Sequence, residues 1–525
     1  MKRDSVVTTM FKRIITLLTV MIIGISSVGC GSVRGEDASD ISEEADADQD
    51  TGEDDSDLRL SDKEEPSLNS PKEDAQDESA VREQITETAV WIDELEDGAM
   101  LLVCTAPDYI FLQSKPGIEE ENGQTRLYPG TYLKWYGEKE TVEKKDYILV
   151  TNRDTGEEGW IEYLYAVRVG WDPDTSVLDV VETDDPLYTY DMMVRDIDVL
   201  CNMYQNALHK NIVGKSVTGK ELYEVILGDP DASHHVMIQA TIHAREYVNT
   251  QLMMKLLEYY AHYYDTGVYG NARYADLFDN VAFHVVPMVN PDGVTISQSG
   301  VDALNDPAIS QMVREAYERD KETLVYEMNS NGDMTWIDHY RDEDFDREAD
   351  PDASRVITFD EYQSIWKANG NGVDLNNNFD AAWEDIDLKW EPSYGSFKGY
   401  AAVSEPETKV LADMAVSRDF ECYLSYHSTG QLIYYDCEGN SEAMSETEKE
   451  FAEFMQDKIH HRMSNNKSAY NVNLGGFGDW IQLSLNKPSL TIESGKKPCP
   501  LPKEEFTAIW LRHRESWAAL AQMYN

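Results

Sequence analysis

Cysteine is scarce in this chain, with six among 525 residues. They are scattered, and if Cys30 is modified as argued below, the odd number that remains is not a disulfide framework. None stands at the spacing of a structural zinc site, which cysteines usually close. The sequence therefore argues against a small disulfide-stapled fold and against a cysteine-bound structural zinc.

Long apolar runs are also missing near the N-terminus. The run at residues 14–25 is shorter than the about 20 residues of a membrane-spanning helix, and it follows a basic start. Small residues then precede Cys30, as in a bacterial lipobox. We expect a lipoprotein-type signal peptide at residues 1–29, lipidation of Cys30 and a lipid-anchored, extracytoplasmic protein. A cleaved, freely secreted protein is the alternative, and a retained signal anchor is the third.

Positively charged residues are also scarce in this chain. Lysine and arginine number 45 against 99 acidic residues, a formal charge of −54, so the basic footprint of a nucleic-acid-binding protein is absent. Residues 36–87 alone hold 21 acidic and four basic residues. Such a segment buries too little apolar surface to fold, which predicts a disordered acidic tether at residues 30–88.

Residues 89–170 change to short β-rich runs separated by turns such as Lys115-Pro116-Gly117 and Tyr128-Pro129-Gly130. The pattern predicts a small all-β barrel. Its order of motifs, ending in Glu158-Gly159-Trp160-Ile161, resembles the bacterial SH3-like domain. That resemblance implies a cell-wall-binding module in a secreted hydrolase. A β-barrel spacer that binds nothing is the alternative.

Residues 187–525 alternate helical and strand patterns. Residues 192–200 have helical spacing, and residues 221–227, 235–240, 281–287 and 421–426 read as strands. This alternation predicts an α/β domain with a sheet flanked by helices, whose site lies beyond the strand ends. We expect paired His460 and His461, with Glu448 and Glu450 upstream, to form a solvated face without a role.

Three short motifs carry metal chemistry. They are His243-Ala244-Arg245-Glu246, Ser425-Tyr426-His427-Ser428 and Leu490-Thr491-Ile492-Glu493. Together they supply two nitrogens and one carboxylate for zinc, and a separate carboxylate. A catalytic zinc takes three protein ligands and leaves a position for water, so this set fits a catalytic rather than a structural metal.

These motifs and four others occur in the order of the zinc carboxypeptidase family, which residues 188–525 resemble. The others are Gly214-Lys215-Ser216, the run from Pro287 to Gly293, the run from Gly372 to Phe379, and Ser404-Glu405-Pro406-Glu407. Trp366-Lys367-Ala368-Asn369 brings the chain nearer to the bacterial branch that includes γ-D-glutamyl-diamino acid peptidases. The resemblance implies a mixed sheet flanked by helices.

The resemblance also implies roles for individual residues. His243, Glu246 and His427 would hold zinc, and Glu493 would accept a proton from water and return it to the leaving amine. Asp374 would bond the far nitrogen of His243. Lys367 falls where the family has a cation for the developing oxyanion. Further positions implied to contact substrate or to take part in catalysis are Arg245, Asn376, Asn377 and Tyr470, with Asn471 as the alternative to Tyr470.

Asn377 departs from the family pattern. Asn376-Asn377-Asn378 stands where the family has Asn-Arg-Asn, so the arginine that grips a terminal carboxylate is absent. The sequence therefore predicts an extracytoplasmic zinc peptidase acting on peptidoglycan stem peptides. The alternatives are a general secreted carboxypeptidase and an inactive cell-wall-binding protein on the same fold. We expect a cell-wall partner through the SH3-like domain and a membrane contact through the lipid anchor.

Overall fold

The computed structural model describes residues 89–118, 125–185, 187–342, 344–347, 354–468 and 474–525. Residues Glu87–Asn525 form one compact unit. The predicted signal peptide, Cys30 and the acidic tether lie outside the described residues, as does Tyr470. Within the described residues no helix is long and apolar enough to cross a membrane.

The N-terminal part of this unit, which we call the β-domain, is built from short strands. Among the described residues, five form an antiparallel sheet in the order β6-β5-β4-β1-β7. Apolar side chains of alternate positions, such as Leu133 and Ile148, fill its core. The resemblance to an SH3-like domain stays a prediction. The strands are β1 (Met100–Cys104), β2 (Ile110–Phe111), β3 (Arg126–Leu127), β4 (Tyr132–Val142), β5 (Lys145–Asn152), β6 (Glu158–Glu162) and β7 (Ala166–Arg168).

The large domain is organised around a mixed sheet, eight-stranded within the described residues, in the order β18-β17-β19-β16-β10-β13-β9-β8. The central strands β13, β10, β16 and β19 are parallel to one another. Their carboxyl ends therefore lie side by side, at the end of the sheet where these strands finish. The strands are β8 (Leu208–Lys215), β9 (Glu221–Leu227), β10 (His234–Ala240), β13 (Val281–Val286), β16 (Cys422–His427), β17 (Leu432–Tyr435), β18 (Arg462–Asn465) and β19 (Ser489–Glu493).

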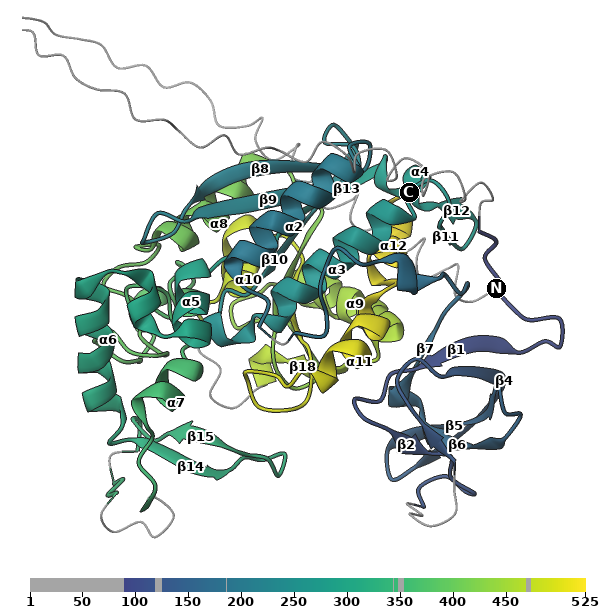
Figure 1. Ribbon diagram of the computed structural model, residues 1–525, viewed down its shortest axis with the longest axis horizontal. Coiled ribbons are helices and arrows are strands. Elements are labelled where there is room, and N and C mark those ends of the chain that lie inside the picture. Colours follow the sequence, from purple (N-terminus) through teal and green to yellow (C-terminus); the bar gives the residue numbers. More distant parts are fainter. Residues whose placement is uncertain (1–88, 119–124, 186, 343, 348–353, 469–473) are drawn as a thin grey trace, which may run out of the picture. The chain divides into compact units, whose positions relative to one another are not determined.

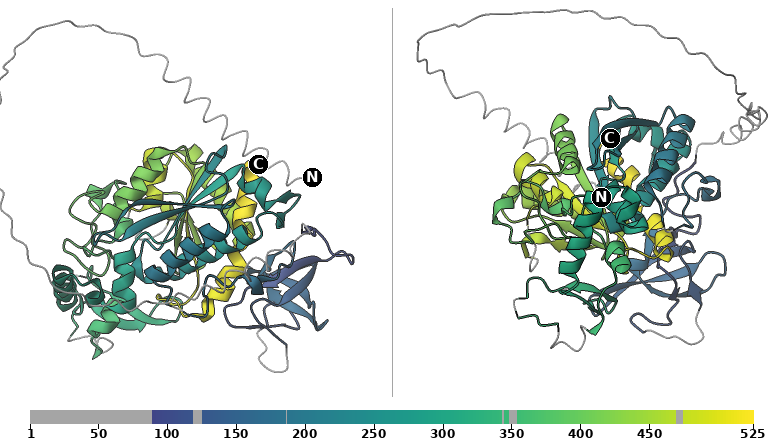
Figure 2. Two further views of the ribbon diagram at one scale, coloured as in Figure 1. Left: turned by 45° about the horizontal axis from the view of Figure 1, so that its top comes forward. Right: turned by 60° about the vertical axis from the view of Figure 1, so that its left-hand side comes forward.

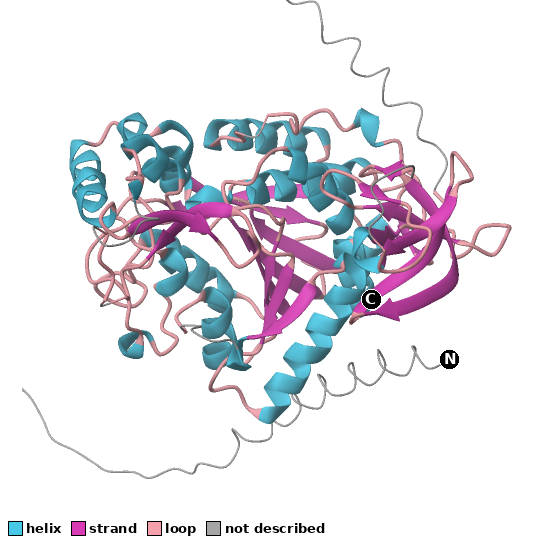
Figure 3. Ribbon diagram, turned by 90° about the horizontal axis from the view of Figure 1, so that it is seen from below, coloured by secondary structure: helices cyan, strands magenta, loops and turns pink. Residues whose placement is uncertain are grey.

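Helices cover both faces of this sheet (Figures 1, 2 and 3). One face packs Met237 and Tyr423 against α8 and α10, and on the other Trp517 of α12 stacks on Phe283. The α/β fold predicted for this region is confirmed. The helices are α2 (Tyr190–Met203), α3 (Val248–His262), α4 (Tyr274–Phe278), α5 (Pro291–Ser299), α6 (Pro307–Asp320), α7 (Phe359–Ser364), α8 (Pro406–Ser417), α9 (Glu442–Ile459), α10 (Phe477–Trp480), α11 (Glu504–His513) and α12 (Ser516–Tyr524).

Local sequence explains where several helices begin. Thr189 accepts a hydrogen bond from Met192 N at the start of α2, and Asp306 caps α6 in the same way. Every residue of α3 except its last is buried, which suits a helix enclosed between the sheet and other helices. In the described part of the large domain, two hairpins lie outside the main sheet, β11 (Val268–Tyr269) with β12 (Ala272–Arg273) and β14 (Leu324–Met328) with β15 (Met334–Asp338).

The β-domain packs directly on α9 and α11. Buried Arg512 donates to the carbonyls of Leu164 at 2.8 Å and Thr105 at 3.2 Å in the β-domain, and to that of Ile459 in α9 at 3.1 Å. The ring of Tyr163 lies 4.4 Å from that of His460. The two domains therefore share a polar and aromatic interface.

The prediction of a solvated face around His460 is wrong. Glu448 is fully buried, and His460 and His461 keep only 9% and 2% of their exposure. Glu448 accepts a hydrogen bond from Ser489 N at the start of β19, and His460 packs against the β-domain. A contact with Ser489 at the start of β19 helps to bury Glu448, and Tyr163 of the β-domain helps to bury His460. Helical periodicity alone reveals neither contact.

Candidate active site

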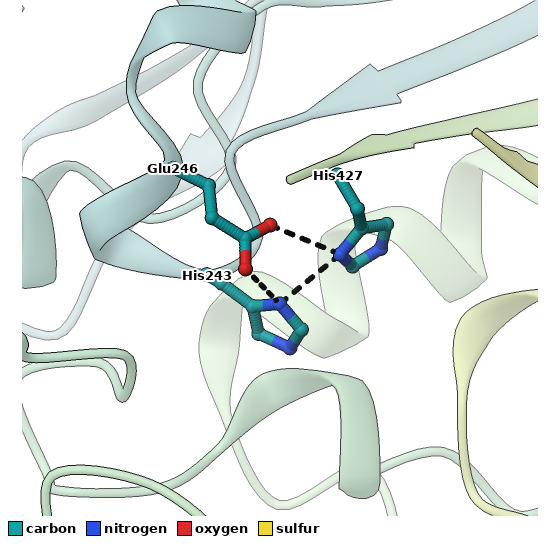
Figure 4. A group of neighbouring side chains, drawn as sticks. All are labelled: His243, Glu246 and His427. Atoms are coloured by element: carbon teal, nitrogen blue, oxygen red, sulfur yellow. Dashed lines mark hydrogen bonds and ion pairs between the residues drawn. The ribbon is translucent and has the colours of Figure 1, made fainter. Parts of the chain in front are cut away.

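Three side chains from the edge of the large sheet converge on one point (Figure 4). His243 follows β10, Glu246 ends the short helical turn Ala244–Glu246, and His427 is the last residue of β16. They form a group that could hold a metal ion, with all three residues buried. The structure thus brings together the three ligands predicted from sequence.

The distances within the group suit zinc. His243 Nδ1 lies 3.0 Å from Glu246 Oε1 and 3.0 Å from His427 Nδ1, and His427 Nδ1 lies 3.2 Å from Glu246 Oε2. Ligand atoms at the bond lengths of a tetrahedral zinc stand about 3.4 Å apart. The ligand atoms of this group therefore lie slightly closer together than they would around a bound zinc ion. Both imidazoles would therefore ligate through Nδ1.

Glu246 also needs a cation for electrostatic reasons. It is 3% exposed, and a buried carboxylate is costly without compensation. Burial by itself would raise the pKa of Glu246, but the two imidazoles hold that pKa below its usual range. Its Oε2 accepts a hydrogen bond from Ser428 N at 3.0 Å. A buried anion between two ring nitrogens fits the zinc that the sequence predicts.

Asp374 lies behind His243. Its Oδ1 stands 3.2 Å from His243 Nε2, on the far side of the ring from the metal group. Its Oδ2 accepts hydrogen bonds from Ser396 N and from Lys367 Nζ, each at 3.0 Å. Burial would raise the pKa of Asp374, but Lys367 and His243 hold it well below its usual range. Asp374 is therefore placed to orient His243.

Lys367 joins Asp374 to the open side of the site. Its side chain is 25% exposed and lines the same cavity as His427 and Glu493. The ion pair with Asp374 fixes the ammonium group next to the metal group. A cation held there can stabilise negative charge that develops on a substrate oxygen.

Glu493 faces the metal group from the neighbouring strand. It ends β19 and pairs in register with His427 of β16. Burial raises the pKa of Glu493, the Glu246 carboxylate adds to this rise, and the cations of Lys367 and Arg245 oppose it. A carboxyl group with a raised pKa is suited to exchange a proton near neutral pH.

A cavity of about 190 Å³ opens in front of these residues. Asn376 and Asn377 line it, as expected of substrate-contacting residues, and Asn376 Oδ1 accepts a hydrogen bond from Phe477 N at 3.0 Å. Arg245 is not among the lining residues, although its charge acts on Glu493. The roles given to Tyr470 and Cys30 lie outside the described residues.

Asp479 is the site residue that the sequence did not point out. It lines the cavity and is 8% exposed. Its Oδ2 accepts a hydrogen bond from Gly476 N at 3.1 Å, while no donor among the described residues contacts Oδ1. Burial raises the pKa of Asp479 to about 7. A single aspartate at the start of a short helix gives no sequence signal, because such residues usually only cap the helix.

Comparisons with known proteins agree with this geometry. A family model described as zinc carboxypeptidase matches residues 193–516. γ-D-Glutamyl-L-diamino acid endopeptidase 1 of Lysinibacillus sphaericus is 28% identical over 328 residues, which cover 62% of this chain and 69% of that protein. Carboxypeptidase D of Homo sapiens is 25% identical over 329 residues, covering 60% of this chain and 19% of that protein.

A search of solved structures finds the thrombin activatable fibrinolysis inhibitor, with a TM-score of 0.46 and 18% sequence identity. The match covers 67% of this chain and 80% of that chain. The family match spans the domain that carries His243, Glu246, His427 and Glu493.

Proposed function

Because this chain belongs to the zinc carboxypeptidase family, we propose that it hydrolyses a peptide bond next to a diamino acid in peptidoglycan stem peptides. That it is a zinc-dependent peptidase follows from the family and from the His243–Glu246–His427 group. The observation that carries the finer proposal is the cavity beside this group, where Asp479 is present and the family's arginine is replaced by Asn377.

The residues of the site divide the reaction between them. His243, Glu246 and His427 would hold zinc, which would supply a Lewis acid for the substrate carbonyl and for water. Glu493 accepts the proton of the attacking water and passes it to the leaving amine. Lys367 donates to the oxygen on which negative charge develops. Asp374 holds the His243 ring in one orientation, so that Nδ1 faces the metal.

The charges that line the cavity support the choice of substrate. Asn376 and Asn377 offer neutral amides, which bind a terminal carboxylate less strongly than the bidentate fork of an arginine. Asp479 Oδ1 instead offers an unpaired carboxylate oxygen in a buried setting. An ammonium group on the substrate residue would complement it. A diamino acid carries such a group, and the relative from Lysinibacillus sphaericus is named for a γ-D-glutamyl-L-diamino acid bond.

The proposal extends to the place of action. The basic start, the short apolar run and Cys30 support an extracytoplasmic protein held by a lipid anchor, with the acidic segment as a tether. The resemblance of the β-domain to an SH3-like module supports contact with the cell wall. Stem peptides are exposed on that side of the membrane.

The test is a digest of defined muropeptides and ordinary peptides with free C-termini, read by mass spectrometry. We expect cleavage at the bond that precedes the diamino acid and poor release of single C-terminal residues from ordinary peptides. Efficient release from ordinary peptides would favour a general carboxypeptidase and reject the substrate proposal. Failure to cut any peptide after loading with zinc would favour the inactive wall-binding alternative.

A further inference from the structure

A groove of about 1020 Å³ runs between the β-domain and the large domain. We call it the interdomain groove. One wall comes from the β4–β5 hairpin and from Tyr163–Tyr165, and the other from the segments that follow β16, α9 and β19. The groove is therefore formed only when the two domains pack together.

Backbone pairing links the wall from the large domain to the strands of the active site. Leu432, the residue after Gln431, pairs in register with Glu493. Gln431 N donates to Gly495 O at 3.0 Å, two residues after Glu493, and both Gln431 and Lys496 line the groove. A chain bound in the groove would thus lie next to the segments that carry His427 and Glu493.

The groove also carries charges of both signs. Within the described residues, Lys144 and Arg462 have no ion-pair partner, and neither does Glu143 in the same hairpin turn. A ligand with both carboxylate and ammonium groups complements such a surface. The aromatic rings offer little to a sugar, because Tyr163 packs against His460 and Tyr165 lies under Lys496 Nζ at 4.3 Å.

We propose that the interdomain groove is a second binding site, which holds the part of a long peptide substrate that extends beyond the residues at the cleaved bond. This inference rests on the proposed function for the choice of peptide. Its ligand is an extended, cross-linked stem peptide, whose carboxylate and ammonium groups meet Lys144, Arg462 and Glu143.

The test compares two substrates on the full chain, a single stem peptide and a cross-linked dimer of stem peptides. The double variant Lys144→Glu with Arg462→Glu should lower the ratio of kcat/KM for the dimer to that for the single peptide about fivefold to tenfold. Lys115→Glu is a control for the effect of one charge reversal outside the groove, because Lys115 is exposed in the β-domain and does not line the groove. It should leave the ratio unchanged.

An unchanged ratio in the double variant would overturn the proposal. A higher rate on a single stem peptide that carries attached sugars would also overturn it, because the groove would then bind glycan and not peptide. Binding of the dimer to Glu493→Gln, measured by calorimetry with and without the two groove substitutions, separates this inference from the proposed function. Loss of affinity in the groove variant supports the second site even if the dimer is not cut at the expected bond.

Discussion

His427 and Glu493 are register partners on the parallel strands β16 and β19, each at the last residue of its strand. One strand end therefore delivers a side chain of the metal-binding group, and the next delivers the carboxyl group to which we assign the proton transfer. The backbone ladder fixes their separation, because paired residues of a sheet cannot shift independently. This pairing leads to the first prediction.

Glu493→Gln should keep zinc and lose turnover by about 10²- to 10⁴-fold, because a neutral amide cannot accept the proton of the attacking water. His427→Ala should lose the metal as well, since it removes a ligand. Metal analysis and kcat measured on the same preparations check both results. Loss of zinc in Glu493→Gln would contradict the separation of the two roles.

Asp374→Asn should weaken zinc binding by about 10- to 100-fold. The neutral amide no longer balances Lys367 and no longer favours one orientation of the His243 ring. Competition with a chelator measures the affinity. Asp380→Asn is the control, because Asp380 is exposed and lies in the same segment. Equal zinc affinities in the two variants would reject the orienting role of Asp374.

Asn377→Arg should raise release of C-terminal residues from ordinary peptides by about 10- to 100-fold. A bidentate, charge-assisted pair with the terminal carboxylate contributes about 1.5–3 kcal/mol. The rate is measured as kcat/KM on a peptide with a free C-terminus and on its C-terminal amide. A gain of similar size on both substrates would show that the arginine does not bind the carboxylate.

Asp479 should make the preference for diamino substrates depend on pH. Burial raises its pKa to about 7, so the ionised form that attracts an ammonium group becomes dominant only above that pH. The ratio of kcat/KM for a diamino substrate to that for a neutral analogue should rise as the pH passes about 7. In Asp479→Asn the ratio should be low and flat. A rise that persists in this variant would assign the titration to another group.

The raised pKa of Asp479 also makes the stability of the fold depend on pH. The substrate preference rises with pH, whereas this contribution to stability falls. Between about pH 4 and pH 7 the folded protein keeps a proton on Asp479 that the unfolded chain has released. The contribution of this group to the free energy of unfolding is therefore present at low pH and is lost as the pH rises through about 7. Denaturation of Asp479→Asn should lack this part of the pH dependence.

Arg512→Met should loosen the β-domain. The substitution leaves the carbonyls of Leu164 and Thr105 without their donor, at a cost of about 1–3 kcal/mol for each buried group that stays unsatisfied. Calorimetry of the wild-type chain should show the two domains unfolding together, and the variant should show the β-domain unfolding first. A single, unshifted transition in the variant would contradict the bridging role of Arg512.

The sequence by itself pointed to the residues of the metal-binding group and to Glu493 beside it. His243, His427 and Glu493 each follow or end a strand that is apolar enough to be recognised, and the carboxyl ends of parallel strands meet at one edge. The residue types then specify the metal, because two imidazoles and a carboxylate leave zinc an open position. The sequence also showed that Asn377 stands where the family has an arginine, because the change lies within a short motif.

Only the tertiary structure decided how distant segments combine. Asp479 and Asn377 line one cavity because α10 packs beside the loop that carries Asn376, through the bond from Phe477 N to Asn376 Oδ1. His460 lies against Tyr163, and the interdomain groove exists, because the β-domain packs on α9 and α11 through Arg512. Periodicity reports only whether a residue faces inward on its own element, whereas burial by another domain depends on contacts between residues hundreds of positions apart.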